Sequence, residues 1–306
     1  QNGSLKGHRT GELIFYYCIA TLPLIHFLIF YVYVNLNSVI LAFQEYKFID
    51  GQGKFIFSTL QLETVWNNLV YGMELKELLS HSLIFYAFSL GVVTPTALFF
   101  SYYIYKKYKF SEFFRVMLFI PTIISSLVVA FMYKFFIDRG VVEICRLFGK
   151  EIMPPLSNPS QAFTYILIYT LLVSFGGNVI MYSSTMTRIP VSVVEYARID
   201  GVGPVKEFFS ITLPLIFPTI STFIIVGVAG IFTNQANLYA LYGESAPENV
   251  RTFGYHMFVL LRRSSSSDMS GYPYIAALGV FATIVVVPLT FFAKRLLDKI
   301  DPNVQY

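Results

Sequence analysis

Long apolar stretches alternate with short polar ones along the whole chain. A helix that crosses a bilayer needs about 20 residues with few charges. Six stretches meet or nearly meet this condition, and they predict membrane-spanning helices near 13–34, 82–104, 116–133, 162–187, 213–233 and 273–293. We therefore expect an all-α integral membrane protein in which 13–293 form the transmembrane domain and 1–12 and 294–306 are polar end segments.

The composition supports a membrane protein and excludes several other classes. Of 306 residues, 55% are apolar and 18% aromatic, whereas only 13% are charged. A soluble domain carries about 25% charged residues, so a cytosolic globular protein is excluded, as are disordered, collagen-like and coiled-coil sequences. The net charge of +4 requires no nucleic-acid partner.

Prolines and glycines interrupt several predicted spans. Such residues are tolerated in a bilayer when neighbouring helices satisfy the freed backbone groups, and small residues let helices approach closely. The residues concerned are Pro23, Pro95, Pro121, Gly176, Gly177, Pro214, Pro218, Gly227, Gly230 and Pro288. We expect a kinked bundle in which these helices pack against protein.

The first apolar stretch and the two cysteines carry no processing or cross-linking signal. The stretch is longer than the short core of a cleavable signal peptide, so we expect it to stay in the membrane. Cys18 lies in this stretch and Cys145 in a polar connection, which predicts neither a disulfide nor a metal site.

The positions of Lys and Arg predict the orientation. Cytoplasmic loops carry an excess of these residues, and the short segment 105–115 contains Lys106, Lys107, Lys109 and Arg115. We therefore expect both termini, together with 105–115 and 188–212, to face the cytoplasm. The segment 44–79 is then external and is expected to form a small cap with an amphipathic helix.

The connection 188–212 has an internal pattern that a simple loop does not need. Ser192 and Glu195 have the spacing of a capping box, which predicts the start of a helix. Gly201 can end it in a left-handed conformation after about nine residues. Pro204 can open a second short helix that leads into the next span.

This connection resembles the coupling segment of the inner-membrane permease subunits of bacterial ABC importers, in the carbohydrate-uptake branch. The resemblance rests on an ordered set: Arg188, Ile189, Pro190, Glu195, Ala197, Asp200, Gly201, Phe208, Leu213, Pro214 and Pro218. The chain departs from the usual pattern at Tyr196 and Val202, where alanine is common. Similarity at 42–46, 119–121, 235–239 and 274–279 extends to permeases for oligosaccharides derived from complex polysaccharides.

The resemblance implies the six-helix fold of type I ABC importers and a set of partners. These are a second related permease, two cytoplasmic ATPase subunits and an extracytoplasmic solute-binding protein that delivers a sugar or oligosaccharide. The complex is expected in the bacterial cytoplasmic membrane, where its bundles would rock to open a central site to one side at a time. ATP and Mg would be bound by the ATPase subunits, and no cofactor by this chain.

We expect the centre of ATPase docking at Glu195, Tyr196, Ala197, Asp200 and Gly201. In this hypothesis Glu195 orders the helix, Ala197 permits close approach, and Asp200 with Gly201 fixes the turn. The alternative is that Glu195 only caps a surface helix and Asp200 only ends it.

Polar residues within or next to the spans are candidates for the solute pathway, because polar groups in hydrocarbon are costly without partners. They are Asn178, Asn234, Gln235 and Asn237. The alternative is that their amides bond to neighbouring helices or to the second permease, and for Asn237 simple solvation.

Other functions lack their sequence signatures. No P-loop motif and no H-E-x-x-H motif occurs, so this subunit is not expected to be an enzyme. A secondary transporter would need ionisable residues within the spans. The sequence still permits a signalling or scaffold membrane protein, and it permits a permease of the same family that carries a non-sugar solute.

Overall fold

The computed structural model describes the backbone of residues 2–49, 52–264 and 269–301, with side chains from residue 15 onward. The chain divides into two compact units, 1–70 with 263–281 and 71–262 with 282–306. Each unit is described by itself. The helix α15 (Gly271–Ile300) begins in the first unit and ends in the second.

The first unit contains one long apolar helix followed by a hairpin and a shorter helix. The elements are α1 (Asn2–Phe27), the π-helical turn η1 (Leu28–Tyr33), α2 (Val34–Ala42), β1 (Gln44–Ile49), β2 (Gln52–Phe57) and α3 (Leu60–Val70). The strands are antiparallel, with Gln44 opposite Phe57 and Ile49 opposite Gln52. The amide of Asn68 donates to the hydroxyl of Tyr274 across 3.3 Å, which joins α3 to the start of α15.

Every regular element among the described residues of the second unit is helical, and turns and irregular segments connect these helices. Its elements are α4 (Glu74–Phe88), η2 (Ser89–Val93), α5 (Thr94–Tyr105), α6 (Ser111–Ile123), α7 (Ser126–Phe135), η3 (Phe136–Val141), α8 (Val142–Leu147), α9 (Pro159–Met186), α10 (Val191–Ile199), α11 (Pro204–Glu207), η4 (Phe208–Thr212), α12 (Leu213–Ala229), α13 (Leu238–Tyr242), η5 (Glu248–Val250) and α14 (Phe253–Arg263). Here η2, η3 and η4 are π-helical turns and η5 is a 3₁₀ turn.

Among the described residues, five helical segments are long and apolar enough to cross a membrane, and a bent pair makes a sixth if it is one span. The predicted all-α membrane class is therefore confirmed. The helices extend beyond several predicted spans, as in Glu74–Tyr105 and Gly271–Ile300, because a helix continues past the apolar stretch that reveals it. Glu74 and Glu77 accordingly lie in the first turn of α4, and the segment 44–79 contains a separate helix, α3.

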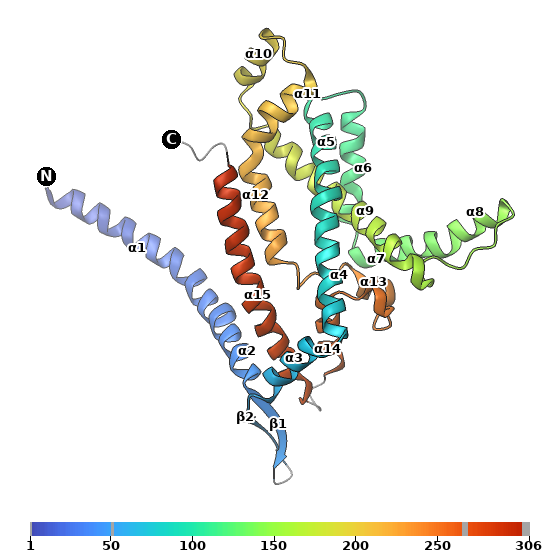
Figure 1. Cartoon of the computed structure of the whole chain (residues 1–306). Coiled ribbons are helices and arrows are strands. Elements are labelled where there is room, and N and C mark those ends of the chain that lie inside the picture. The colour runs from blue at the N-terminus through green and yellow to red at the C-terminus, as the bar shows by residue number, and fades with distance from the viewer. Residues whose placement is uncertain (1, 50–51, 265–268, 302–306) are drawn as a thin grey trace. The chain divides into compact units, whose positions relative to one another are not determined.

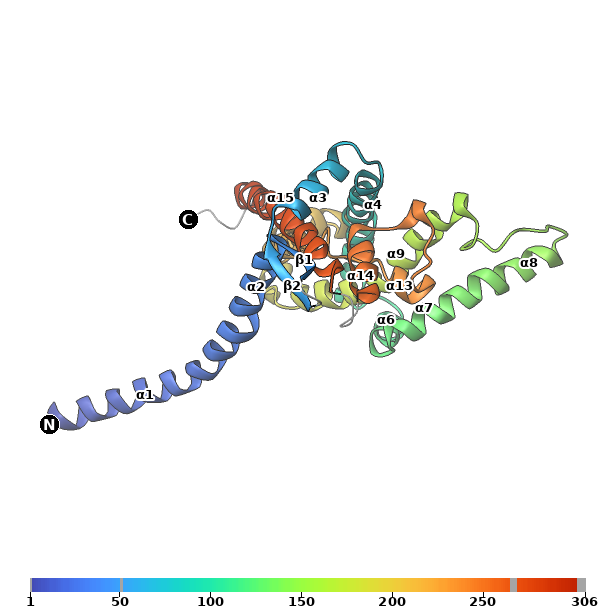
Figure 2. The same cartoon turned by 90° about the horizontal axis from the view of Figure 1, so that it is seen from below.

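The third predicted span is not a straight helix. The segments Ser111–Ile123 and Ser126–Leu147 meet at an angle of 104°, and Ile124 and Ser125 are extended between them. Pro121 has no N–H for the helical ladder and weakens the end of α6. Figures 1 and 2 show α7 and α8 as an arm that points away from α5.

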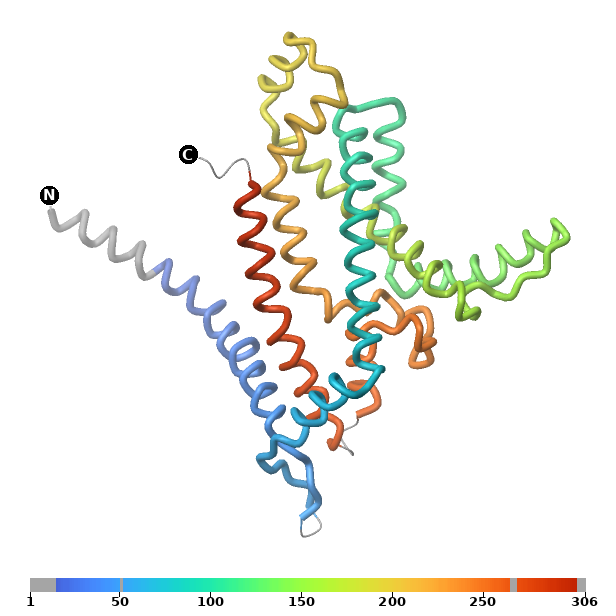
Figure 3. The backbone as a smooth tube through the Cα atoms, viewed as in Figure 1, coloured from blue at the N-terminus to red at the C-terminus, as the bar shows by residue number. Residues whose placement is uncertain are grey.

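Prolines also account for two of the π-helical turns. Pro95 cannot donate to the Gly91 carbonyl, and the turn η2 ends at Val93, two residues before this proline. The Thr94 N–H and the Thr94 hydroxyl both donate to the Ser89 carbonyl, the hydroxyl at 3.1 Å. Pro214 follows η4 in the same way. Because these turns absorb the irregularity, α4 to α5 and α11 to α12 each remain one continuous helix (Figure 3).

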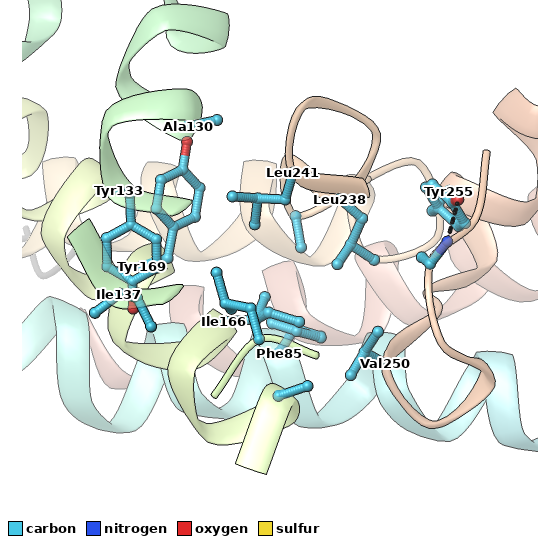
Figure 4. Packing of buried hydrophobic residues seen from close by; sticks show 14 of the residues in the cluster. Phe85, Ala130, Tyr133, Ile137, Ile166, Tyr169, Leu238, Leu241, Val250 and Tyr255 are labelled. Atoms are coloured by element: carbon cyan, nitrogen blue, oxygen red, sulfur yellow. Dashed lines mark hydrogen bonds between the residues drawn. The ribbon is translucent and has the colours of Figure 1, made fainter. Parts of the chain in front are cut away.

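The helix α9 is the centre of the second unit. It packs against α5, α6 and α12, and the buried Ser101 hydroxyl of α5 donates to the Val179 carbonyl of α9 at 3.0 Å. One apolar cluster around α9 includes Tyr182, Met186 and Phe208. A second cluster joins α7, α9 and α13, and Figure 4 shows Tyr133, Ile166 and Leu241 within it.

The contact between α6 and α9 depends on Gly176. A Cβ atom built on Gly176 would lie 2.5 Å from the carbonyl oxygen of Leu118, whereas one on Gly177 would meet nothing within 4 Å. We expect Gly176→Ala to destabilise the protein by about 1–3 kcal/mol through overpacking. Thermal unfolding of the purified chain in detergent should therefore shift down by several degrees.

Gly177→Ala is the matched control, since it adds the same methyl group one residue away. It should leave the unfolding temperature unchanged or raise it slightly, because alanine favours helix. Equal shifts for the two variants would contradict close α6–α9 packing at Gly176.

Candidate functional site

The connection 188–212 forms two short helices at the end of α9. Ile189 is buried, and Pro190 is extended (φ −57°, ψ 132°) immediately before α10. The helix α10 has nine residues, as predicted, and α11 begins at Pro204. Figure 1 shows α11 beside the C-terminal end of α5, with α10 beyond α11.

The predicted capping box at Ser192 and Glu195 is wrong. Pro190 is the N-cap of α10, and no side chain caps the helix. Pro190 is the last extended residue, so the helix begins at Val191. Ser192 therefore lies inside the first turn. A capping side chain must stand at the N-cap, before the helix begins. Ser192 is the second residue of the helix, so its hydroxyl does not accept from the free N–H groups of the first turn.

The predicted terminator is confirmed. Gly201 has φ +70°, its N–H donates to the Arg198 carbonyl at 3.1 Å, and the Val202 N–H donates to the Ala197 carbonyl at 2.9 Å. This pair of bonds is a Schellman motif, which favours glycine at the left-handed position. The turn holds α10 in a defined direction without help from a partner.

The candidate docking residues divide between two faces. Glu195, Tyr196, Asp200 and Gly201 are exposed, and Tyr196 is 68% exposed. Ala197 is only 5% exposed, so its small side chain lies against this chain rather than towards a partner. Three further apolar side chains that sequence reasoning missed are exposed with Tyr196, namely Val191, Ile199 and Val205.

The short helices are anchored to α5 by aromatic packing. The ring of Phe208 lies 5.0 Å from the rings of both Phe99 and Tyr102. The Tyr102 hydroxyl donates to the Pro204 carbonyl at 3.1 Å. The connection is thus fixed to α5 at Pro204 and Phe208, whereas most residues of the preceding helix α10 are exposed.

A cavity of about 370 Å³ lies between α4, α9 and α12. Two of the predicted pathway residues, Asn178 and Asn234, line it, whereas Gln235 and Asn237 do not. Asn234 accepts a bond from the Ala236 N–H at 2.8 Å. Asn178 has no hydrogen-bond partner within the described part of the chain, so its amide is available to a bound molecule.

Hydroxyl groups and aromatic rings complete the lining. The residues that sequence reasoning missed include Ser82, Tyr86, Ser89, Thr94, Tyr182 and Thr233. Ser82, Tyr86 and Ser89 are spaced as one face of an α-helix. A regular helix would place Val93 next on this face, but the π-helical turn adds one residue and brings Thr94 there instead, while Val93 is fully buried.

The cavity lining contains no Asp, Glu, Lys, Arg or His. Its polar groups are hydroxyls and amides, with aromatic faces beside them. Such a surface can bind a neutral polyhydroxylated molecule through hydrogen bonds and stacking, and it offers no counter-charge to an ion. No group of three or more His, Cys, Asp or Glu that could hold a metal occurs in the described ranges.

The segment after α12 makes hydrogen bonds to two residues of the cavity lining, Asn234 and Ser82. The Thr252 hydroxyl donates to the Asn234 carbonyl at 2.9 Å, and the Phe253 N–H donates to the Ser82 hydroxyl at 2.9 Å. In α13, Tyr242 donates to the Leu156 carbonyl at 2.8 Å. Burial, aided by Asp138, raises the pKa of the Tyr242 phenol above its ordinary value, so the hydroxyl remains a donor.

Comparisons with known proteins point to one family. The model of the family described as binding-protein-dependent transport system inner membrane component matches residues 93–306. The arabinooligosaccharides transport system permease protein AraP of Bacillus subtilis (strain 168) is 24% identical over 88% of this chain and 84% of its own. The sn-glycerol-3-phosphate transport system permease protein UgpA of Yersinia pseudotuberculosis serotype I (strain IP32953) is 25% identical over 71% and 74%.

A solved structure has the same fold. It is the crystal structure of a bacterial alginate ABC transporter in complex with a periplasmic protein that has alginate pentasaccharide bound. One of its chains matches 97% of this chain and 98% of its own length, with a TM-score of 0.78 and 18% identity.

The conformation of Gly201 should be measurable in the coupling connection. Gly201→Ala places a Cβ in the left-handed region and is expected to cost about 1–2 kcal/mol. Hydrogen exchange at the Val202 amide, which bonds to Ala197, should speed up about tenfold or more. Gly203→Ala is the control, because Gly203 has φ −70° and a Cβ there meets nothing within 4 Å. Unchanged exchange in Gly201→Ala would contradict the observed turn.

Proposed function

The chain belongs to the family of binding-protein-dependent transport system inner membrane components, and on that premise we propose how its coupling connection and its cavity work. It is a multi-pass inner-membrane permease subunit of an ABC importer, not an enzyme. The motion that ATP hydrolysis drives must therefore be transmitted to this chain through a contact with separate ATPase subunits.

The proposed contact is the exposed face of α10 and α11. Val191, Tyr196, Ile199 and Val205 present apolar surface to solvent at a place fastened to the bundle by the Phe208 packing. A helix with such a face fits a groove on a partner. Two cytoplasmic ATPase subunits, which bind ATP and Mg, would then hold this permease and a second related one. Both termini of this chain would be cytoplasmic, as the Lys and Arg positions predict.

The proposed cargo is a neutral sugar or oligosaccharide, delivered by an extracytoplasmic binding protein. The observation that carries this proposal is the uncharged, hydroxyl-lined and amide-lined cavity around Asn178. The name of AraP refers to arabinooligosaccharides, which are neutral. An anionic cargo such as a glycerol phosphate would lack a counter-charge among these lining residues, and an isolated charge is costly to desolvate.

A charge in the exposed face should block docking. We expect Tyr196→Asp to reduce recovery of the ATPase subunits with the affinity-tagged chain at least tenfold, because the apolar contact would have to bury a carboxylate. Tyr71→Asp is the matched control: Tyr71 is also exposed, at 83%, but it lies just before α4, at the far end of the helix Glu74–Tyr105 from α10. It should retain the ATPase subunits. Full recovery with Tyr196→Asp would contradict the proposed contact.

Labelling tests the orientation of the same face. In a background with Cys18→Ser and Cys145→Ser, Tyr196→Cys should react with a membrane-impermeant maleimide only after the membrane is opened. Reaction in intact spheroplasts would place α10 outside and would refute docking to a cytoplasmic ATPase.

The cavity residue Asn178 should affect transport of neutral cargo. In the reconstituted importer, Asn178→Ala is expected to lower uptake of a neutral oligosaccharide by about fivefold to tenfold, equivalent to the loss of one hydrogen bond. Gln235→Ala should have little effect, because Gln235 lies outside the cavity lining. Radiolabelled neutral and uronate-containing oligosaccharides of equal length would be compared. Preferential uptake of the uronates would contradict a neutral cargo.

A further inference from the structure

A buried ion pair joins the coupling connection to a helix that is remote in sequence. Lys106 caps the C-terminus of α5, and Glu207 is the last residue of α11. The Lys106 ammonium lies 2.7 Å and 2.8 Å from the two carboxylate oxygens of Glu207. The side chains are only 11% and 4% exposed.

Burial makes this pair different from the surface pairs of the chain. Removing two charges from water is costly, and the attraction compensates only when the geometry is good. Here one ammonium reaches both oxygens of one carboxylate, and its nitrogen lies 5.7 Å from the centre of the Tyr102 ring. If α11 moved away from α5, two buried charges would separate, so the pair resists that motion more strongly than apolar packing would.

The bonds near this pair hold both ends of α11. Glu207 is held at the end of the helix, and the Pro204 carbonyl at its start accepts the hydrogen bond from Tyr102. Tyr102 lies in the last turn of α5, and Lys106 is the C-cap residue that follows it. The short helix is therefore fixed in position and in direction relative to α5.

The helix that receives this attachment lines the cavity further along. The segment Glu74–Tyr105 is one continuous helix, and its residues Ser82, Ser89 and Thr94 belong to the cavity lining. The covalent connections of the coupling segment lead only to α9 and α12. The ion pair, together with the Phe208 packing and the Tyr102 hydrogen bond, forms a third route, to the wall formed by α4 and η2.

We infer that Lys106 and Glu207 are positioning residues for coupling: their ion pair makes α11 and the end of α5 move as one body. A displacement of α10 by the ATPase then reaches the cavity through the helix Glu74–Tyr105 as well as through α12. This inference rests on the proposed function, since it assumes that α10 contacts the ATPase.

The test measures solute transported per ATP hydrolysed by the complete importer in proteoliposomes. Loss of stability lowers the amount of active complex but leaves this ratio unchanged, so the ratio separates coupling from folding. We expect Glu207→Gln and Lys106→Met each to lower the ratio at least fivefold while the ATPase subunits still co-purify. The charge swap Lys106→Glu with Glu207→Lys should restore at least half of it.

An apolar pair keeps the test decisive if a single variant fails to fold. Lys106→Met combined with Glu207→Met removes both charges, and such replacements are often neutral for stability. Its ratio is still expected to be low, because apolar contacts do not resist sliding as the ion pair does. Glu112→Gln is the control, since it breaks the exposed pair of Glu112 with Arg115, and it should not change the ratio.

The outcomes distinguish the inference from the proposed function. A wild-type ratio in Glu207→Gln, or in the apolar pair, would overturn the role of Lys106 and Glu207 and leave ATPase docking intact. If the unmodified chain neither retained ATPase subunits nor supported ATP-dependent uptake, the proposed function itself would fail.

Discussion

The need to satisfy backbone hydrogen bonds inside a bilayer governs the second unit of this protein. Where a proline removes an N–H group, either the helix changes its bonding locally or it ends. Before Pro95 and Pro214 the chain forms π-helical turns and continues. After Pro121 it breaks, and the next helix departs at 104°. The shape of the cavity wall and the direction of the arm both follow from these responses.

The second unit has a coupling connection that is held by many contacts at one end and a cavity near its middle. The coupling connection is held by a Schellman turn, by aromatic packing and by a buried ion pair. The cavity, in contrast, is lined by hydroxyl and amide side chains together with aromatic and aliphatic ones, and Gly227 leaves room for the Tyr86 ring. This arrangement suits a subunit that must receive force at a defined place and accommodate a polar molecule elsewhere.

Local signals in the sequence were sufficient where the structure depends on neighbours in the chain. Gly201 and Pro204 end and begin their helices as predicted. Local reasoning failed where a nearby residue intervened, since Pro190 displaced the expected cap at Ser192 and Pro121 preceded the break in the third span. Local patterns also do not reveal the direction of a side chain that depends on packing: Ala197 is buried against this chain, and Gln235 lies outside the cavity lining. The pair Lys106 and Glu207 is separated by 101 positions, and no local pattern relates them.

The extra residue in the π-helical turn Ser89–Val93 makes chain length critical at that point. Each residue turns an α-helix by roughly 100°. Deleting one residue there would rotate α5 by about that angle relative to α4, so Tyr102 and Lys106 would point away from α11 while Ser82 kept its place. A change of a single residue in the length of this turn would therefore need a matching change elsewhere in the same helix.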